Sequence, residues 1–197
     1  MARKSRAEAA ETRLRIMVVA QALFAKRGFA GTSTALIAKQ ANVSEGALFN
    51  HFKDKKVLFS EILLELQRDF DRGVRIAALG DGHGSALDSM RRGFAASVRL
   101  ARDPTYARIV LAEGRAVLGD AEWARIDSGM GRISVEYGLK AVASEHGKSV
   151  TDLSRIATLI LGMLNETVFA LQRKELTDPA ASLKLIEQAM LGWLDIS

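Results

Sequence analysis

Apolar residues recur every three to four positions along most of the chain, and this period predicts helices separated by short polar or glycine-containing segments. The predicted helices cover about residues 7–27, 32–41, 44–52, 54–78, 85–102, 105–117, 120–145, 151–175 and 179–194. No alternating stretch of β-branched residues favours a sheet. Only two prolines occur: Pro104 follows the end of the predicted helix 85–102, and Pro179 opens the last one. The sequence therefore predicts an all-α protein with about nine helices.

The second and third of these helices are short and are joined by a tight turn. Leu36 and Ile37 belong to a buried face of the first. Asn42 occupies the turn, where a left-handed backbone conformation is needed that Asn tolerates better than most residues. In the second, Leu48 and Phe52 lie four residues apart and would anchor the helix to a core. This arrangement is a helix-turn-helix, in which the second helix enters the major groove of DNA.

The second short helix carries the candidate contacts to bases. Ser44 can cap it, and Glu45 lies in its positively polarised first turn. Its outward side would present Glu45, Ala47, Asn50 and His51. Asn50 could pair with adenine, and His51 could bond a phosphate or a base. For each of these two, a solvated surface residue is the alternative.

The stretch from about Leu14 to Leu58 resembles the DNA-binding domain of TetR-family transcriptional regulators. The matching residues are Ala20–Phe24, Gly28, Thr32–Thr34, Ile37–Ala38, Val43–Leu48, His51–Phe52 and Lys55. The family usually has Gly where Asn42 stands and Tyr where Phe49 stands. That Tyr commonly bonds a backbone phosphate through its hydroxyl, and Phe49 has no hydroxyl for this contact.

The resemblance implies a three-helix DNA-binding domain at residues 1–56 and a larger helical effector-binding and dimerisation domain at residues 57–197. It implies that Lys55 anchors a phosphate. A hydroxyl of the segment 32–34 would cap the next helix, contact a phosphate, or do both. The full set of expected DNA contacts is Thr32, Ser33, Thr34, Ser44, Glu45, Gly46, Ala47, Phe49, Asn50, His51 and Lys55.

The same resemblance implies a homodimer, formed through the last two helices, that binds a palindromic double-stranded DNA operator and is released by a small-molecule effector. This would make the protein a repressor. The residues alone show only that the helices at 151–175 and 179–194 carry surplus apolar surface, which fits either a dimer or a larger monomeric core. An architectural DNA-binding protein without an effector is the alternative function.

Charge is distributed unevenly between the two ends of the chain. Residues 1–58 carry 11 Lys and Arg against 4 Asp and Glu, whereas residues 59–197 carry 17 against 19. A basic segment that coincides with a helix-turn-helix favours a nucleic-acid-binding module. Arg3, Lys4 and Arg6 form an N-terminal arm that either reaches the DNA or is a solubilising tail.

Polar residues interrupt apolar segments of the larger domain. Asn165 and Glu166 lie within the apolar run 156–171, and Glu113 follows four apolar residues. Because a buried carboxylate is costly unless it is paired, such groups either line a ligand pocket or pair with an Arg or face water. The candidate ligand-binding residues are Tyr106, Glu113, Trp123, Asn165, Glu166 and Phe169.

Other chemistry finds little support in the 197 residues. There is no cysteine, and none of the three histidines stands at a metal-ligand spacing from another His or a carboxylate. No nucleophile motif is present, so neither an enzyme nor a metal or cofactor is expected. No apolar run reaches the roughly 18 residues of a membrane span, and the charged N-terminus lacks an apolar signal core. A cytoplasmic protein without membrane contact is expected.

Overall fold

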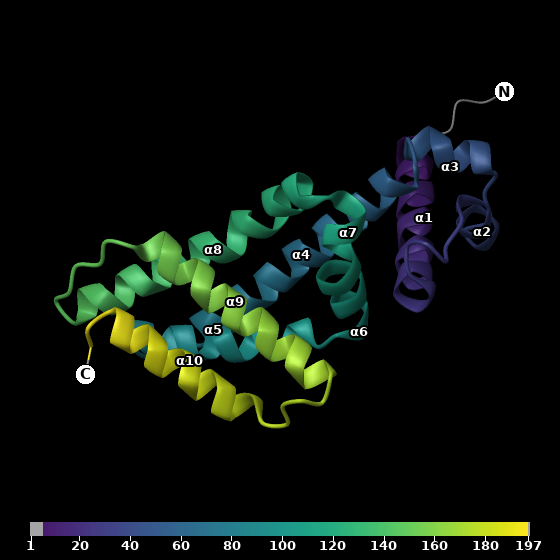
Figure 1. The fold of residues 1–197 in the computed structure, drawn as a ribbon. Helices are drawn as coiled ribbons and strands as arrows, with labels where there is room; N and C mark the ends of the chain where they lie inside the picture. The colour runs from purple at the N-terminus through teal and green to yellow at the C-terminus, as the bar shows by residue number, and fades with distance from the viewer. Residues whose placement is uncertain (1–5, 197) are drawn as a thin grey trace. The chain divides into compact units, whose positions relative to one another are not determined.

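The computed structural model describes residues 6–196, except for the side chains of residues 124 and 127–130. All secondary structure in the described part is helical, which confirms the all-α prediction (Figure 1). The predicted arm residues Arg3 and Lys4 lie outside the described residues. The elements are α1 (Arg6–Arg27), α2 (Thr34–Gln40), α3 (Glu45–His51), α4 (Lys55–Leu79), α5 (Ala86–Ala101), α6 (Pro104–Tyr106), the π-helix η1 (Ala107–Glu113), α7 (Gly114–Leu118), α8 (Asp120–Glu145), α9 (Leu153–Gln172) and α10 (Pro179–Trp193).

The chain divides into two compact units. The first comprises Met1–Gln67 and Pro104–Trp123, and the second comprises Arg68–Asp103 and Ala124–Ser197. The first unit thus holds α1 to α3, the beginning of α4, and the segment from α6 to α7. The predicted functional boundary after residue 56 follows the helix-turn-helix motif, not these units, and it stays a prediction.

The core of the first unit is built from the apolar faces that the sequence period predicts. Ile16, Ala20 and Phe24 of α1 are fully buried. Phe24 and Phe59 lie with their ring centroids 5.2 Å apart in an edge-to-face arrangement, which adds to the area that each ring buries. Leu48 of α3 is fully buried beside this core. The helix α3 therefore packs on α1 and α2, with its apolar side buried.

The predicted helix at residues 105–117 is divided into α6, η1 and α7, and the π-helical winding of its middle is a difference from the prediction. Gly114 follows η1 and is buried. A Cβ atom at this position would lie 2.5 Å from Trp123 Cζ3 and 2.8 Å from Leu63 Cδ1. The close approach of these two side chains thus fixes the register of the helix at the end of η1. Apolar periodicity carries no information on such a contact.

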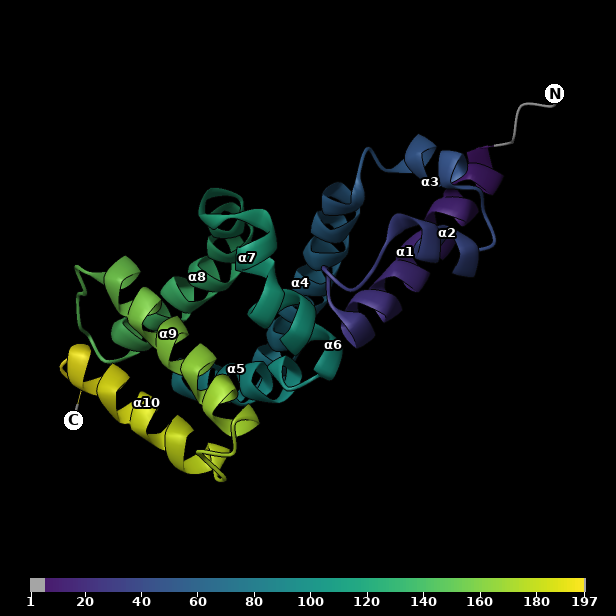
Figure 2. The same cartoon turned by 45° about the vertical axis from the view of Figure 1, so that its right-hand side comes forward.

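In the second unit, α9 and α10 lie side by side, as both ribbon views show (Figure 2). By length and composition α9 could cross a membrane. However, Ile160, Leu164 and Val168 are buried against the rest of the unit, as in a core helix. At Gly138 of α8 a Cβ atom would lie 3.0 Å from Met90 Sδ, so the glycine lets α5 and α8 approach each other closely.

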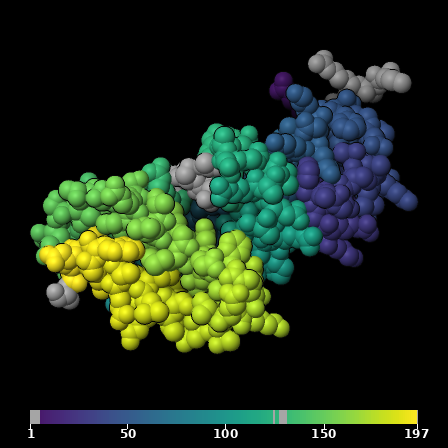
Figure 3. Space-filling model, in the orientation of Figure 1, coloured from purple at the N-terminus to yellow at the C-terminus, as the bar shows by residue number. Residues whose placement is uncertain are grey.

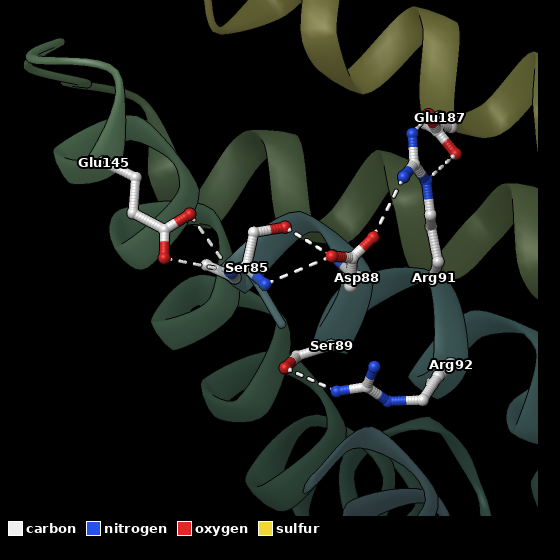
Figure 4. A network of polar contacts seen from close by, with 8 residues as sticks. Ser85, Asp88, Ser89, Arg91, Arg92, Glu145 and Glu187 are labelled. Atoms are coloured by element: carbon white, nitrogen blue, oxygen red, sulfur yellow. Dashed lines mark hydrogen bonds and ion pairs between the residues drawn. The ribbon is translucent and has the colours of Figure 1, made fainter. Parts of the chain in front are cut away.

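A polar network joins α5 to α10 and to the end of α8 (Figure 4). Arg91 donates two hydrogen bonds to Glu187, from Nε at 2.8 Å and from Nη2 at 2.6 Å, and a third to Asp88 at 3.0 Å. Ser85 and Asp88 form a capping box at the start of α5, where Glu145 also accepts two bonds from the N–H of Ala86. The network therefore fixes the N-terminal end of α5 from two neighbouring helices.

The Arg91–Glu187 pair predicts a pH-dependent stability for the second unit. Hydrogen bonds from Arg91 hold the pKa of Glu187 below its ordinary value of 4.5. A lowered carboxyl pKa adds stability above the ordinary value, and that stability is lost as the pH falls through the folded-state pKa. Glu187→Gln should lower the free energy of unfolding at pH 7 by about 1 kcal/mol, the upper end for a partly exposed pair.

Urea unfolding of the full chain at a series of pH values tests this. The difference between the wild type and Glu187→Gln should shrink steadily once the pH falls below 4.5. Glu175→Gln is the matched control, because in the described part of the chain Glu175 pairs with Arg173, two residues away, and not with another helix. Equal effects of the two variants would contradict a special role for the α5–α10 pair.

Candidate nucleic-acid interface

Local hydrogen bonds build the two short helices as the sequence predicts. Ser33 Oγ accepts from the N–H of Leu36 at 3.2 Å, and Ser44 Oγ accepts from the N–H of Ala47 at 3.1 Å. Asn42 has φ +54°, which is the left-handed conformation expected in the turn. These contacts confirm the two predicted N-caps and the turn, and they fix where α3 begins.

The solvent-facing side of α3 carries most of the predicted contact residues. Glu45, Gly46, Phe49 and Asn50 are exposed, whereas Ala47 and His51 are half-buried. The opposite side is buried, with Leu48 and Phe52 at 0% and 1% exposure. Because one side of α3 is buried in the core and the other is exposed to solvent, the helix can enter the major groove of DNA without a change of structure. Phe49 is 46% exposed and can offer apolar contact only.

The three hydroxyls before and in the first turn of α2 have different surroundings. Thr32 is fully buried, and its hydroxyl donates to the carbonyl oxygen of Gly28 at 2.8 Å. Ser33 is exposed and caps α2, while Thr34 donates to Glu45 Oε2 at 3.2 Å. The burial of Thr32 takes its hydroxyl out of the candidate phosphate contacts. The hydroxyls of Ser33 and Thr34 remain candidate phosphate contacts.

Lys55 is the first residue of α4 and lies at the loop between α1 and α2. Its Nζ donates to the carbonyl oxygens of Phe29 and Thr32, at 2.9 Å each, and stands 4.1 Å from the centroid of the Phe29 ring. An ammonium group has three donors, so one remains for a phosphate. The predicted phosphate contact is thus compatible with the structure, which adds a second role for Lys55 in holding the loop.

Two arginines of α1 support the recognition helix, although sequence analysis did not single them out. The guanidinium of Arg13 stands 4.8 Å from the Phe52 ring centroid and pairs with Glu61. Arg15 Nε donates to the carbonyl oxygen of Ala41, directly before the turn, at 3.0 Å. Their partners lie 26 to 48 residues away in sequence, so no local pattern could have identified them.

The six candidate ligand residues fall into two groups. Tyr106, Glu113 and Trp123 belong to the first unit, where the Tyr106 hydroxyl donates to Gln67 Oε1 at 2.9 Å and Trp123 packs on Gly114. The second unit holds Asn165, Glu166 and Phe169. Glu166 is exposed and accepts a bond from Arg173 at 2.6 Å, which matches the alternative of a surface ion pair.

Two cavities lie within the second unit. One of about 440 Å³ is bordered by Leu159, Trp193 and the loop after α8, and one of about 240 Å³ by Phe94, Leu183 and Arg91. None of the six candidate residues lines either cavity. The location of a ligand site therefore stays a prediction. Among the described residues, no group of three or more His, Asp or Glu side chains could hold a metal ion.

A capped helix-turn-helix whose second helix is exposed defines the class of helix-turn-helix DNA-binding proteins. Residues 16–62 match the family described as "Bacterial regulatory proteins, tetR family", and residues 87–195 match the "Tetracyclin repressor-like, C-terminal domain". The chain belongs to the TetR family of bacterial transcriptional regulators, which are not enzymes. This confirms the resemblance inferred from the sequence.

Individual relatives agree with this assignment. The chain is 55% identical over 62 residues to the transcriptional regulator AcrR of Shigella flexneri, and 41% identical over 61 residues to the transcriptional repressor BepR of Brucella suis. These alignments span 32% and 31% of this chain but only 29% of each relative. The solved structure of a TetR-family regulator from Pectobacterium atrosepticum is 28% identical, with a TM-score of 0.70 over 95% of this chain and 94% of its own.

Proposed function

We propose that the protein is a repressor that binds a palindromic operator as a homodimer and is released by a small, partly apolar molecule. The observation that carries the DNA-binding part is the open side of α3, which presents Glu45, Phe49 and Asn50 from a helix whose other side is locked into the core. The basic charge of residues 1–58 supplies attraction to phosphates. One α3 from each subunit would occupy a major groove, with half-sites about one helical turn or a multiple apart.

The apolar surface of α9 and α10 supports the dimer. Leu159 on α9 is 50% exposed, and Leu185 and Trp193 on α10 are 67% and 42% exposed. In the space-filling view the two helices lie side by side on the face turned to the reader (Figure 3). Exposed large apolar side chains on two neighbouring helices are typical of an interface between subunits. A second copy that presents the same two helices would cover them in a four-helix bundle.

Selection of binding sites from random duplex DNA at near-physiological salt tests this function. A recovered palindrome with fixed half-site spacing is expected, and its fragment then serves as the operator probe for the variants below. Weak, salt-sensitive binding without any preferred sequence would contradict the proposal. It would favour the alternative of an architectural DNA-binding protein, which needs only the basic first unit.

Asn50 is expected to read a base. The side chain is exposed on α3, and Asn forms a bidentate pair with adenine in the major groove. Asn50→Ala should therefore relax the preference at one position in each half-site, with a cost of about 1–3 kcal/mol for the preferred base. Repeating the selection with this variant measures the change. A loss of affinity that is equal for all sequences would place Asn50 on the DNA backbone instead.

A further inference from the structure

The carboxylate of Glu113, the last residue of η1, lies at the loop that follows α1. Its Oε2 accepts a hydrogen bond from the backbone N–H of Phe29 at 2.7 Å, and its Oε1 accepts one from Arg108 Nε at 3.2 Å. The Glu113 side chain is 24% exposed. Because hydrogen bonds to an ionised group are about twice as strong as neutral ones, this contact can hold the loop backbone in place. Glu113 thus joins η1 to the helix-turn-helix within the first unit.

Gly28 provides the space that this carboxylate occupies. The residue has φ +76°, a conformation that Gly adopts at little steric cost. A Cβ atom at position 28 would lie 2.5 Å from Glu113 Oε1 and 2.9 Å from Arg108 Nη2. The absence of a side chain at position 28 therefore lets the Glu113 carboxylate approach the loop backbone closely.

The winding of η1 determines where Glu113 points. In an α-helix each residue turns by about 100° and rises 1.5 Å. A π-helix bonds residue i to i+5, so its turn holds more residues than an α-turn. The register at the end of η1 is fixed where Trp123 and Leu63 close on Gly114. A one-residue change of winding would turn the Glu113 side chain away from the Phe29 amide.

Lys55 holds the same loop through its carbonyl groups. Its ammonium group donates to the carbonyl oxygens of Phe29 and Thr32. The N–H of the same Phe29 donates to Glu113. Thr32 directly precedes Ser33, the N-cap of α2. The loop thus determines where α2 starts, and α2 leads through the turn at Asn42 into α3. Loosening the loop would move the recognition helix relative to α1.

We propose that Glu113 is a positioning residue for DNA binding, which acts through the backbone N–H of Phe29. This inference rests on the proposed operator binding and deepens it. It assigns to Glu113 a role different from the ligand contact that the sequence suggested, because the carboxylate is already engaged by Phe29 and Arg108. The winding of η1 would then determine how α2 and α3 are oriented relative to α1.

Operator titration of four full-length variants tests the proposal. Glu113→Ala and Glu113→Asp should each weaken operator binding about tenfold, or about 1.4 kcal/mol, because neither side chain reaches the Phe29 amide. Glu113→Gln keeps an acceptor oxygen of the same reach and should stay within about threefold of the wild type. Glu65→Ala is the charge-matched control, since Glu65 is exposed on α4 in the same unit. It should leave binding unchanged.

Hydrogen exchange without DNA supplies a readout that does not depend on an operator. In Glu113→Ala and Glu113→Asp the Phe29 amide should exchange at least tenfold faster, while amides in the middle of α1 stay protected. Unchanged exchange at Phe29 would overturn the contact. Normal operator binding by both variants despite faster exchange would overturn the positioning role. A wild type that selects no sequence would instead refute the proposed function, and the exchange experiment would still test the contact.

Discussion

Replacing Leu185 by Asp is expected to leave the protein monomeric and to weaken operator binding about a hundredfold or more. Leu185 is 67% exposed in the middle of α10, the helix proposed to pair with its copy. Burying a Leu side chain contributes about 1.5–3 kcal/mol, and a two-fold interface loses this contribution twice. An Asp at the same place would also have to lose its hydration without a partner.

The loss of operator affinity follows from the loss of the dimer. Two linked helix-turn-helix units bind a palindrome as one bivalent ligand, so that the second half-site is bound at a high effective concentration. A monomer has only one half-site contact. Sedimentation velocity over a range of protein concentrations and operator titration measure the two effects on the same samples.

Ile76→Asp is the matched control for this substitution. Ile76 is 64% exposed and belongs to the same unit, but it lies on α4. Its replacement should leave both the oligomeric state and operator binding as in the wild type. A Leu185→Asp protein that remains a dimer would show that another surface forms the interface. Monomerisation by both variants would point to a general loss of folding.

The features that could be predicted from the sequence are those whose causes lie within a few residues. The hydroxyls of Ser33 and Ser44 accept from amides three residues ahead, and the turn at Asn42 depends on its own backbone conformation. Helical period alone selected Leu48 and Phe52 as buried. Short-range hydrogen bonds and a 3.6-residue period are properties of the local sequence, so a single chain suffices to find them.

The features that could not be predicted depend on partners far along the chain. Glu113 and Phe29 are separated by 84 residues, and Lys55 lies 26 residues after Phe29. The sequence marked Glu113 as a polar residue after an apolar run, which would line a ligand pocket, pair with an Arg or face water. The pair with Arg108 matches the second of these. Which backbone amide that carboxylate accepts from depends on how α1 and η1 pack. The π-helical winding is hidden for the same reason, because it depends on the contact of Gly114 with Trp123.

Glu166 shows a different limit of sequence reasoning. The run from 156 to 171 is apolar nearly all round, so the Glu166 carboxylate within it could line a pocket, pair with an Arg or face water. In the structure Leu159 and Glu166 are both exposed on α9, and Glu166 pairs with Arg173. An apolar helix with an exposed side agrees with cover by a second subunit as well as with cover inside one chain. Composition cannot distinguish these two cases, and Leu185→Asp can.

Replacing Lys55 by Ala is expected to lower both the stability of the first unit and its affinity for every DNA sequence. The variant loses two hydrogen bonds from a charged donor to the carbonyl oxygens of Phe29 and Thr32, as well as the contact with the Phe29 ring. Bonds to charged groups contribute about 1.5–3 kcal/mol each, and water can replace part of this at a half-buried site. A loss of about 2 kcal/mol in the free energy of unfolding is therefore expected.

The salt dependence of DNA binding by Lys55→Ala distinguishes a phosphate contact of Lys55 from its structural role in the loop. If the third donor of the ammonium group binds a phosphate, the slope of log affinity against log salt concentration should fall by about one per subunit. Lys53→Ala is the control for charge, since Lys53 is exposed two residues earlier and should leave the free energy of unfolding unchanged. Weaker binding by Lys55→Ala with an unchanged salt slope would leave Lys55 only its role in the loop.

The double variant Lys55→Ala, Glu113→Ala tests whether the two residues hold the same loop. Glu113 accepts a bond from the amide of Phe29, whose carbonyl oxygen Lys55 binds. The double variant should therefore lose less operator affinity than the two separate losses added together, because either change alone already releases the loop.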